Sequence, residues 1–105
     1  MVRQGEFRPK NNIERIMILA IENCFDIQRS NTKVEIKPNG YVVWLYDTPI
    51  LIKHFYDVYV CDGGFNTATT QSRLNALGIA YSKNRSKNKV EMTCLSKMMD
   101  ILQNL

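Results

Sequence analysis

The chain has 105 residues, of which 45% are apolar, so it is long enough for one compact domain and too short for two. Its 14 Lys and Arg against 10 Asp and Glu give a net charge of +4, which favours acidic partners. No stretch has the roughly 18 apolar residues that a membrane span needs, and the first ten residues lack the apolar core of a signal peptide. We therefore expect a cytoplasmic protein with no membrane contact.

Three cysteines are widely spaced and form no C-x-x-C pair: Cys24, Cys61 and Cys94. An odd number at this spacing indicates neither a disulfide framework nor a zinc site. We expect buried thiols, no metal and no cofactor.

The first predicted unit is a basic arm followed by a helix. Residues 1–10, with Arg3, Arg8 and Lys10, are predicted to be a flexible arm, and residues 11–105 form the single domain. Asn11 begins a capping-box-like start, and apolar residues then recur at helical spacing as far as residue 27. The apolar face is wider than one stripe, so this helix is central to the core or shared with a second subunit, and a homodimer is expected.

Four strands are predicted to follow. Residues 33–37 alternate charged and apolar side chains, and Pro38-Asn39-Gly40 suits a turn closed by a glycine able to take a positive φ. Residues 41–46 are apolar on both faces, and residues 50–55 and 57–61 follow after short turns. The predicted fold class is α+β, with an antiparallel four-stranded meander, an N-terminal helix, a central helix after the Gly63-Gly64 turn, a basic hairpin and a C-terminal helix over residues 95–105.

The stretch from residue 57 to 78 changes from strand to turn to helix. Gly63-Gly64 supplies backbone freedom for the turn, and threonines then crowd the start of a helix predicted over residues 67–77. Free N–H groups, hydroxyls and Arg73 one turn further make a candidate seat for an anion. A sharp turn with redundant helix caps explains the same residues without a ligand.

Within this stretch, residues 63–75 read GGFNTATTQSRLN. The run resembles a pattern found in many small phage-encoded proteins, G-G-aromatic-x-T-x-T-T-(Lys or Gln)-x-R-(Leu or Ile)-N. In those proteins it is similarly preceded by a strand resembling residues 46–50 (YDTPI) and followed by a basic hairpin, and Gln71 stands where Lys is commoner. The resemblance covers the central part of the chain. It implies a phage origin, and hence the cytoplasm of a host cell, more than an activity.

Positive charge is concentrated in one segment. From Gly63 to Val90 the sequence has five cations and no acid, so this segment is +5 while the rest of the chain sums to −1. Residues 79–81 and 89–92 are predicted to be the arms of a hairpin with a polar, basic loop. Such asymmetry is typical of a nucleic-acid contact, although a solvated loop would share it. Tyr81 adds a ring able to stack on a base.

These features predict a nucleic-acid-binding protein, RNA more than duplex DNA, that modulates a host or defence process. The predicted contacts are Thr69, Thr70, Arg73, Tyr81, Lys83, Arg85, Lys87 and Lys89. The alternative is a protein-binding inhibitor of a host enzyme, antitoxin-like or anti-defence, for which Trp44 and Tyr46 would be exposed beside one another. A minor alternative is a metal-independent ribonuclease using His54, Arg73 and a Tyr. With one His and no nucleophile motif, we expect no enzyme.

Overall fold

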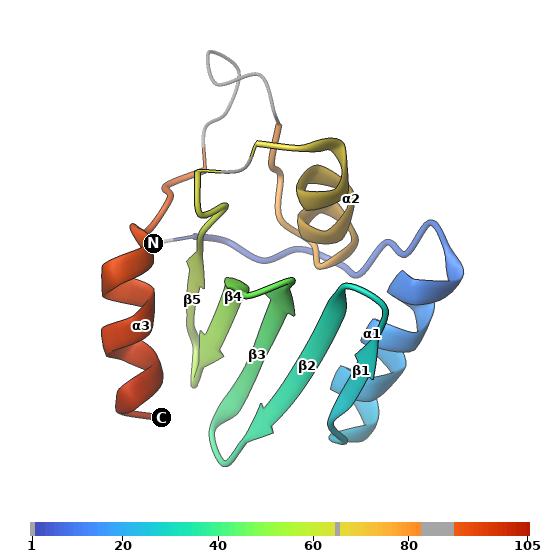
Figure 1. Ribbon diagram of the computed structural model, residues 1–105. Helices are drawn as coiled ribbons and strands as arrows, with labels where there is room; N and C mark the ends of the chain where they lie inside the picture. The colour runs from blue at the N-terminus through green and yellow to red at the C-terminus, as the bar shows by residue number, and fades with distance from the viewer. Residues whose placement is uncertain (1, 65, 83–89) are drawn as a thin grey trace.

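The computed structural model describes residues 2–64, 66–82 and 90–105. The strands of this part form one antiparallel sheet in sequence order, with α1 and α2 on one face and α3 on the other (Figure 1). The elements are α1 (Asn12–Asn23), β1 (Ile27–Arg29), β2 (Thr32–Lys37), β3 (Gly40–Leu45), β4 (Thr48–His54), β5 (Asp57–Val60), α2 (Ala68–Ala76) and α3 (Leu95–Gln103). The class is α+β, as predicted.

The prediction of four strands is wrong, because β1 precedes them. The first helix ends at Asn23 instead of continuing to Ile27, since Cys24 adopts the left-handed conformation with φ 56° and its N–H donates to the carbonyls of Ala20 and Ile21. The chain then extends, and Ile27 pairs with Val34 of β2. A glycine is the usual signal for such a helix stop, so a cysteine in this role hid both the stop and the strand.

The predicted hairpin after Gly78 is wrong for the residues that can be described. Neither residues 79–82 nor residues 90–94 contain a strand. The N–H of Tyr81 donates to the carbonyl of Ile79 in a local turn at 2.8 Å, and that of Thr93 donates to the carbonyl of Val60 at 2.7 Å. The basic residues of the proposed loop, 83–89, lie outside the described part.

Two-residue loops join all neighbouring strands of the sheet. Three of these loops begin with a residue in the left-handed region: Ser30 (φ 51°), Tyr46 (φ 55°) and Phe55 (φ 55°). At one end of the sheet the N–H of Tyr46 donates to the carbonyl of Asn31, and at the other the N–H of Phe55 donates to that of Asn39, both at 2.7 Å. Neighbouring loops therefore brace each other at both ends.

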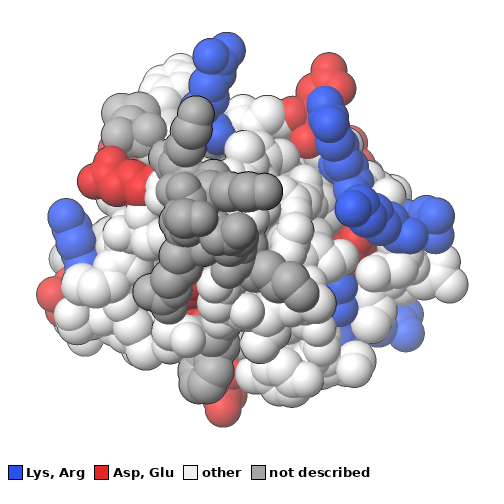
Figure 2. All heavy atoms as spheres, turned by 90° about the horizontal axis from the view of Figure 1, so that it is seen from above, with Lys and Arg blue, Asp and Glu red and all other residues white. Residues whose placement is uncertain are grey.

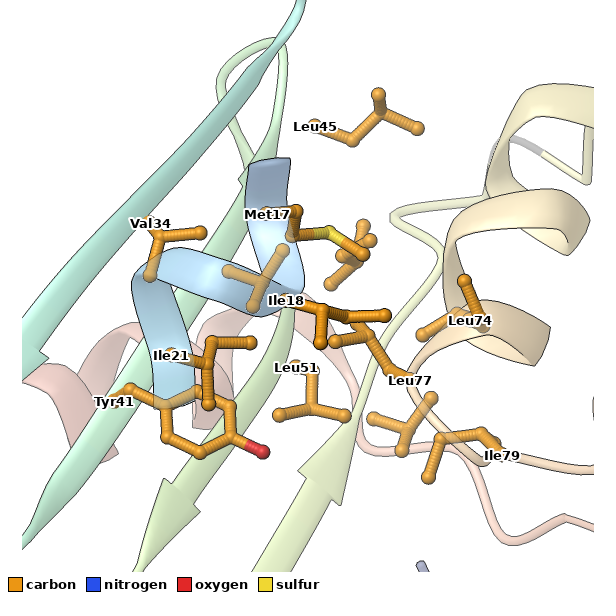
Figure 3. Packing of buried hydrophobic residues seen from close by; sticks show 14 of the residues in the cluster. Met17, Ile18, Ile21, Val34, Tyr41, Leu45, Leu51, Leu74, Leu77 and Ile79 are labelled. Atoms are coloured by element: carbon orange, nitrogen blue, oxygen red, sulfur yellow. The ribbon is translucent and has the colours of Figure 1, made fainter. Parts of the chain in front are cut away.

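The main core lies between the sheet and the pair α1 and α2. Met17, Ile18 and Ile21 of α1 point toward the sheet and toward Leu74 and Leu77 of α2 (Figure 3). On the other face, Met98 of α3 covers Val42 and Ile52. The middle strand, β3, is thus covered on both faces, as its two-sided apolar pattern predicts.

The N-terminal residues pack against this core. The N–H of Gly5 donates to the carbonyl of Gly78 at 2.7 Å, and the N–H of Arg8 donates to that of Ala76 at 2.8 Å. Val2 and Phe7 are partly buried against the main core. The segment predicted as a free arm is therefore docked along the C-terminal end of α2.

Some apolar side chains stay exposed on the helices. They include Leu19 of α1 and Leu95 and Met99 of α3. The expected homodimer stays a prediction. No helix in the described ranges has the length and apolar character needed to cross a membrane.

Gly40 and Gly64 give a matched pair of tests. The expected positive φ of Gly40 is wrong, because Gly40 is not among the glycines with a positive φ. A Cβ at this position would lie 1.8 Å from the carbonyl oxygen of Lys53. The glycine is therefore required because β3 and β4 approach each other closely there. Gly64 has φ 84° and open space around its Cβ position. We expect Gly40→Ala to lower the free energy of unfolding in urea by at least about 2 kcal/mol through overpacking. Gly64→Ala should cost about 1–2 kcal/mol through strain alone. Wild-type stability of Gly40→Ala would contradict the packing argument.

Candidate functional site

The Gly63-Gly64 turn has the backbone that its sequence predicts. Gly63 has φ 63° and Gly64 has φ 84°, which confirms the predicted positive φ. Thr67 then caps α2, because its Oγ1 accepts a hydrogen bond from the N–H of Thr70 at 3.2 Å. The hydroxyls of Thr67 and Thr70 are also hydrogen-bonded to each other at 3.0 Å. Thr70 is 2% exposed, and both hydroxyls are used within the cap.

Arg73 is buried and forms an ion pair with Glu14 of α1. The residue is 5% exposed, and one guanidinium nitrogen lies 2.7 Å from Oε2 of Glu14. Nε donates to Oγ1 of Thr32 at 3.0 Å, and another nitrogen donates to Oδ1 of Asn31 at 3.4 Å. Ser72 donates its hydroxyl proton to the same oxygen of Glu14. The guanidinium thus joins α2 to α1 and to the β1–β2 loop, and it is not a surface contact for phosphate.

Glu14 is held as a carboxylate at the centre of this network. Burial opposes its charge, but hydrogen bonds from the Ser72 hydroxyl, the Lys10 backbone N–H and Arg73, together with the charge of Arg73, outweigh that effect and lower the pKa of Glu14. The N–H of Glu14 donates to Oδ1 of Asn11, so the predicted helix cap forms as well. The predicted capping-box glutamate therefore also anchors a tertiary ion pair.

Tyr81 is part of the core. The residue is 3% exposed and packs in the main hydrophobic cluster, so its ring face is not available to stack on a base. Its hydroxyl oxygen lies 3.0 Å from Oδ2 of Asp62 and 2.7 Å from Oδ1 of Asn66. Of the other predicted contacts, Thr69 is partly exposed at the start of α2. Lys83, Arg85, Lys87 and Lys89 lie outside the described residues.

The described structure does not bring the proposed ribonuclease residues together. His54 ends β4 and pairs with Gly40, and its ring contacts that of Phe55 at 4.6 Å. Arg73 binds beside Thr32, at the opposite end of the sheet. Nor do the described residues gather three or more His, Cys, Asp or Glu side chains into a possible metal site.

The expectation of three buried thiols is wrong for two of them. Cys61 is buried, whereas Cys24 and Cys94 are exposed. Burial raises the pKa of Cys61. Hydrogen bonding with the Ser96 hydroxyl lowers the pKa of Cys94, which sits at the start of α3.

The sequence predicted a basic N-terminal segment but did not predict where that segment docks. Arg8 and Lys10 are exposed and line a hollow of about 450 Å³ together with Gly5, Glu6, Asn75 and residues 78–80 of the chain just after α2, so one carboxylate lies beside the two cations. Residues 78–80 precede the basic stretch 83–89 in the sequence. Figure 2 shows several Lys and Arg side chains, with Asp and Glu side chains among them, on the side of the molecule where α1 and β1 lie. Arg8 and Lys10 lie beside the end of α2 because the N-terminal segment docks there. No local sequence pattern predicts this docking.

The fold and the network define a small α+β protein in which one buried ion pair joins two helices and a loop of the sheet. A family model described as Kyanoviridae Gp96 protein matches residues 10–99. The chain belongs to this family and is a phage protein, in agreement with the origin that its central pattern implies. No curated protein and no solved structure matches the chain.

The buried ion pair predicts an asymmetric response to substitution. Arg73→Met should lower the free energy of unfolding by about 3–5 kcal/mol, because it leaves the Glu14 carboxylate buried without its partner. Adding Glu14→Leu to this variant should recover part of the loss, since both charges are then absent. Urea unfolding of the two single variants and the double variant measures the coupling. Strictly additive losses would show that the pair is not coupled.

The lowered pKa of Glu14 predicts a loss of stability in acid. A carboxyl whose pKa is lower in the folded protein stabilises it fully above the unfolded pKa of about 4.3, and this contribution disappears as the pH falls below that value toward the folded pKa. The Glu14→Gln variant should be less stable than wild type at pH 7, with the difference shrinking below about pH 4. Unfolding measured across this range tests the sign. A constant difference would contradict it.

Proposed function

We propose that this phage protein binds single-stranded nucleic acid, RNA in preference to duplex DNA, and thereby modulates a host or defence process. The proposed contacts are the exposed cations Arg8 and Lys10 together with Lys83, Arg85, Lys87 and Lys89, with Thr69 as a neutral contact. We call Arg8 and Lys10 the basic surface.

The single observation that carries this proposal is the docking of the N-terminal segment. The hydrogen bonds of Gly5 to Gly78 and of Arg8 to Ala76 place two exposed cations beside the chain that enters the basic stretch. Because Glu14 neutralises Arg73, the residues from 63 to 90 contribute one positive charge less to the surface than their sequence indicates. Arg8 and Lys10 add to the charge that is left. Cations clustered in this way release counterions from a phosphate backbone when it binds.

Single strands are favoured over duplexes because α2 lacks the exposed side chains of a helix that reads the major groove. A helix that reads the major groove presents several long polar or basic side chains to the base edges. On α2 the basic side chain, Arg73, is buried, whereas the neutral side chains of Gln71 and Asn75 are partly exposed. A set of cations on the N-terminal segment and on residues 83–89 suits a backbone that can bend to meet them.

A protein partner is supported by one separate observation. Trp44 packs against the cluster under α3, with the Lys33 ammonium 4.8 Å from its ring centroid, whereas Tyr46 is 73% exposed at the β3–β4 loop. The two rings are thus not the joint exposed pair that the inhibitor hypothesis requires, but Tyr46 alone remains available to a partner.

The basic surface predicts a salt-dependent affinity. We expect a fluorescent single-stranded RNA to bind in a polarisation assay, with log Kd changing by about 0.7 per log unit of salt for each phosphate contact. The double variants Arg8→Ala/Lys10→Ala and Arg85→Ala/Lys87→Ala should each weaken binding of every sequence about equally and flatten the slope by roughly 1.4.

The control variant removes two positive charges from another part of the protein. Lys37→Ala/Lys97→Ala changes two cations of the other sheet face and α3, and it should leave both affinity and salt slope close to wild type. If the control variant lost as much RNA affinity as the other double variants, net charge alone would explain the effect. Absence of RNA retention at moderate salt, with inhibition of a purified host enzyme intact, would replace nucleic-acid binding by the inhibitor function.

A further inference from the structure

A second hollow, of about 380 Å³, lies between the β3–β4 loop and the start of α2, at the end of α2 away from Arg8 and Lys10. Its size is within the range of about 300–1,000 Å³ typical of ligand sites. It is lined by Leu45, Tyr46, Asp47, Thr48, Ile50, Asp62, Thr67 and Thr70. These residues come mainly from the two stretches that resemble the phage pattern, so the pattern brings together a surface hollow as well as a turn.

Tyr46 lines this hollow, and its side chain is exposed. Its φ of 55° lies in the left-handed region, where glycine or asparagine is favoured in two-residue loops. Its side chain is 73% exposed, so the ring contributes little to the core. Phe55 has the same φ and is 58% exposed, so this backbone belongs to the two-residue loops; what distinguishes Tyr46 is that its exposed ring lies at the hollow.

The hollow is apolar at its base and acidic at its edge. Leu45 and Ile50 are buried beneath it, and Asp47 and Asp62 line it with no Lys or Arg among the lining residues. The ion pairs within the described ranges include neither aspartate. Asp62 accepts hydrogen bonds from the N–H of Gly64 at 2.9 Å and from the Tyr81 hydroxyl at 3.0 Å, and both donors are neutral. Lys33 lines the adjoining hollow with Tyr46 and Asp47, but it is paired with Glu35 at 3.6 Å. The hollow itself is thus lined by two carboxylates and no cation, on a protein whose net charge is +4.

We propose that this hollow is the docking site for an arginine side chain of a partner protein. A guanidinium can stack on the exposed Tyr46 ring while it donates to carboxylate oxygens, and its aliphatic stem can cover the apolar base. A lysine ammonium lacks the planar fork and is more strongly hydrated. Two carboxylates repel phosphate, so the site is separate from the basic surface and its function does not depend on nucleic-acid binding.

The direct test is an NMR titration of the ¹⁵N-labelled protein with the peptide acetyl-Gly-Arg-Gly-amide. We expect millimolar binding, with shifts confined to the amides of residues 45–48, 62–64 and 67–70. The matched peptide with citrulline in place of arginine has nearly the same shape without the charge, and it should bind about tenfold more weakly. A lysine peptide should fall between the two.

Variants separate this role from a structural one. Tyr46→Asn removes the ring but suits the left-handed backbone, so it should weaken the arginine peptide about 2- to 5-fold while the melting temperature stays equal or rises. Asp47→Asn should weaken it as well. Tyr56→Asn, at the opposite end of the sheet and 93% exposed, is the matched control and should bind like wild type.

Several results would overturn the site. They are equal binding of the citrulline peptide, shifts centred elsewhere, and no shift at any attainable peptide concentration. A lower melting temperature for Tyr46→Asn with unchanged peptide affinity would make the tyrosine structural. Stronger shifts of the same amides with a short single-stranded RNA would assign the hollow to nucleic acid instead of protein.

Discussion

The ion pair between Glu14 and Arg73 is the constraint on which the arrangement of the helices depends. It connects two helices that are separated by the whole sheet in sequence, and Arg73 continues the connection to Thr32 and Asn31 at the β1–β2 loop. A buried charge is tolerable only when its partner is fixed beside it, so α1 and α2 cannot shift independently. The two surfaces proposed for binding lie at opposite ends of α2, so their positions depend on the ion pair that fixes this helix.

The regular parts of the fold followed from local sequence. The helical spacing after Asn11, the alternation in residues 33–37 and the Gly63-Gly64 turn each predicted an element that the structure contains. The missing strand and the wrong hairpin have different causes. Cys24 stops a helix without the glycine that usually marks such a stop. Residues 79–81 have a strand-like sequence, but Ile79 and Tyr81 are buried by tertiary contacts without pairing to a strand. The β-strand propensity of a residue does not include the tertiary contacts that decide whether it pairs in a sheet.

The candidate site was harder to predict, because it depends on which cations reach the surface. Arg73 and Tyr81 have the side chains of a nucleic-acid contact, yet the first meets Glu14 across 59 positions of sequence and the second enters the core. No local pattern reports such a distant partner. For the same reason Arg8 and Lys10 looked like part of a free arm until their segment was found against Ala76 and Gly78.

The meander with its two-residue loops also separates folding into early and late events. Adjacent strands meet through contacts close in sequence, which form fast, while the closure of Glu14 on Arg73 and of Gly5 on Gly78 brings distant parts of the chain together. During synthesis, the sheet can assemble before α2 has left the ribosome. The carboxylate of Glu14 then stays in water until α2 supplies Arg73, and α3, which follows α2 in the chain, covers the other face of the sheet last.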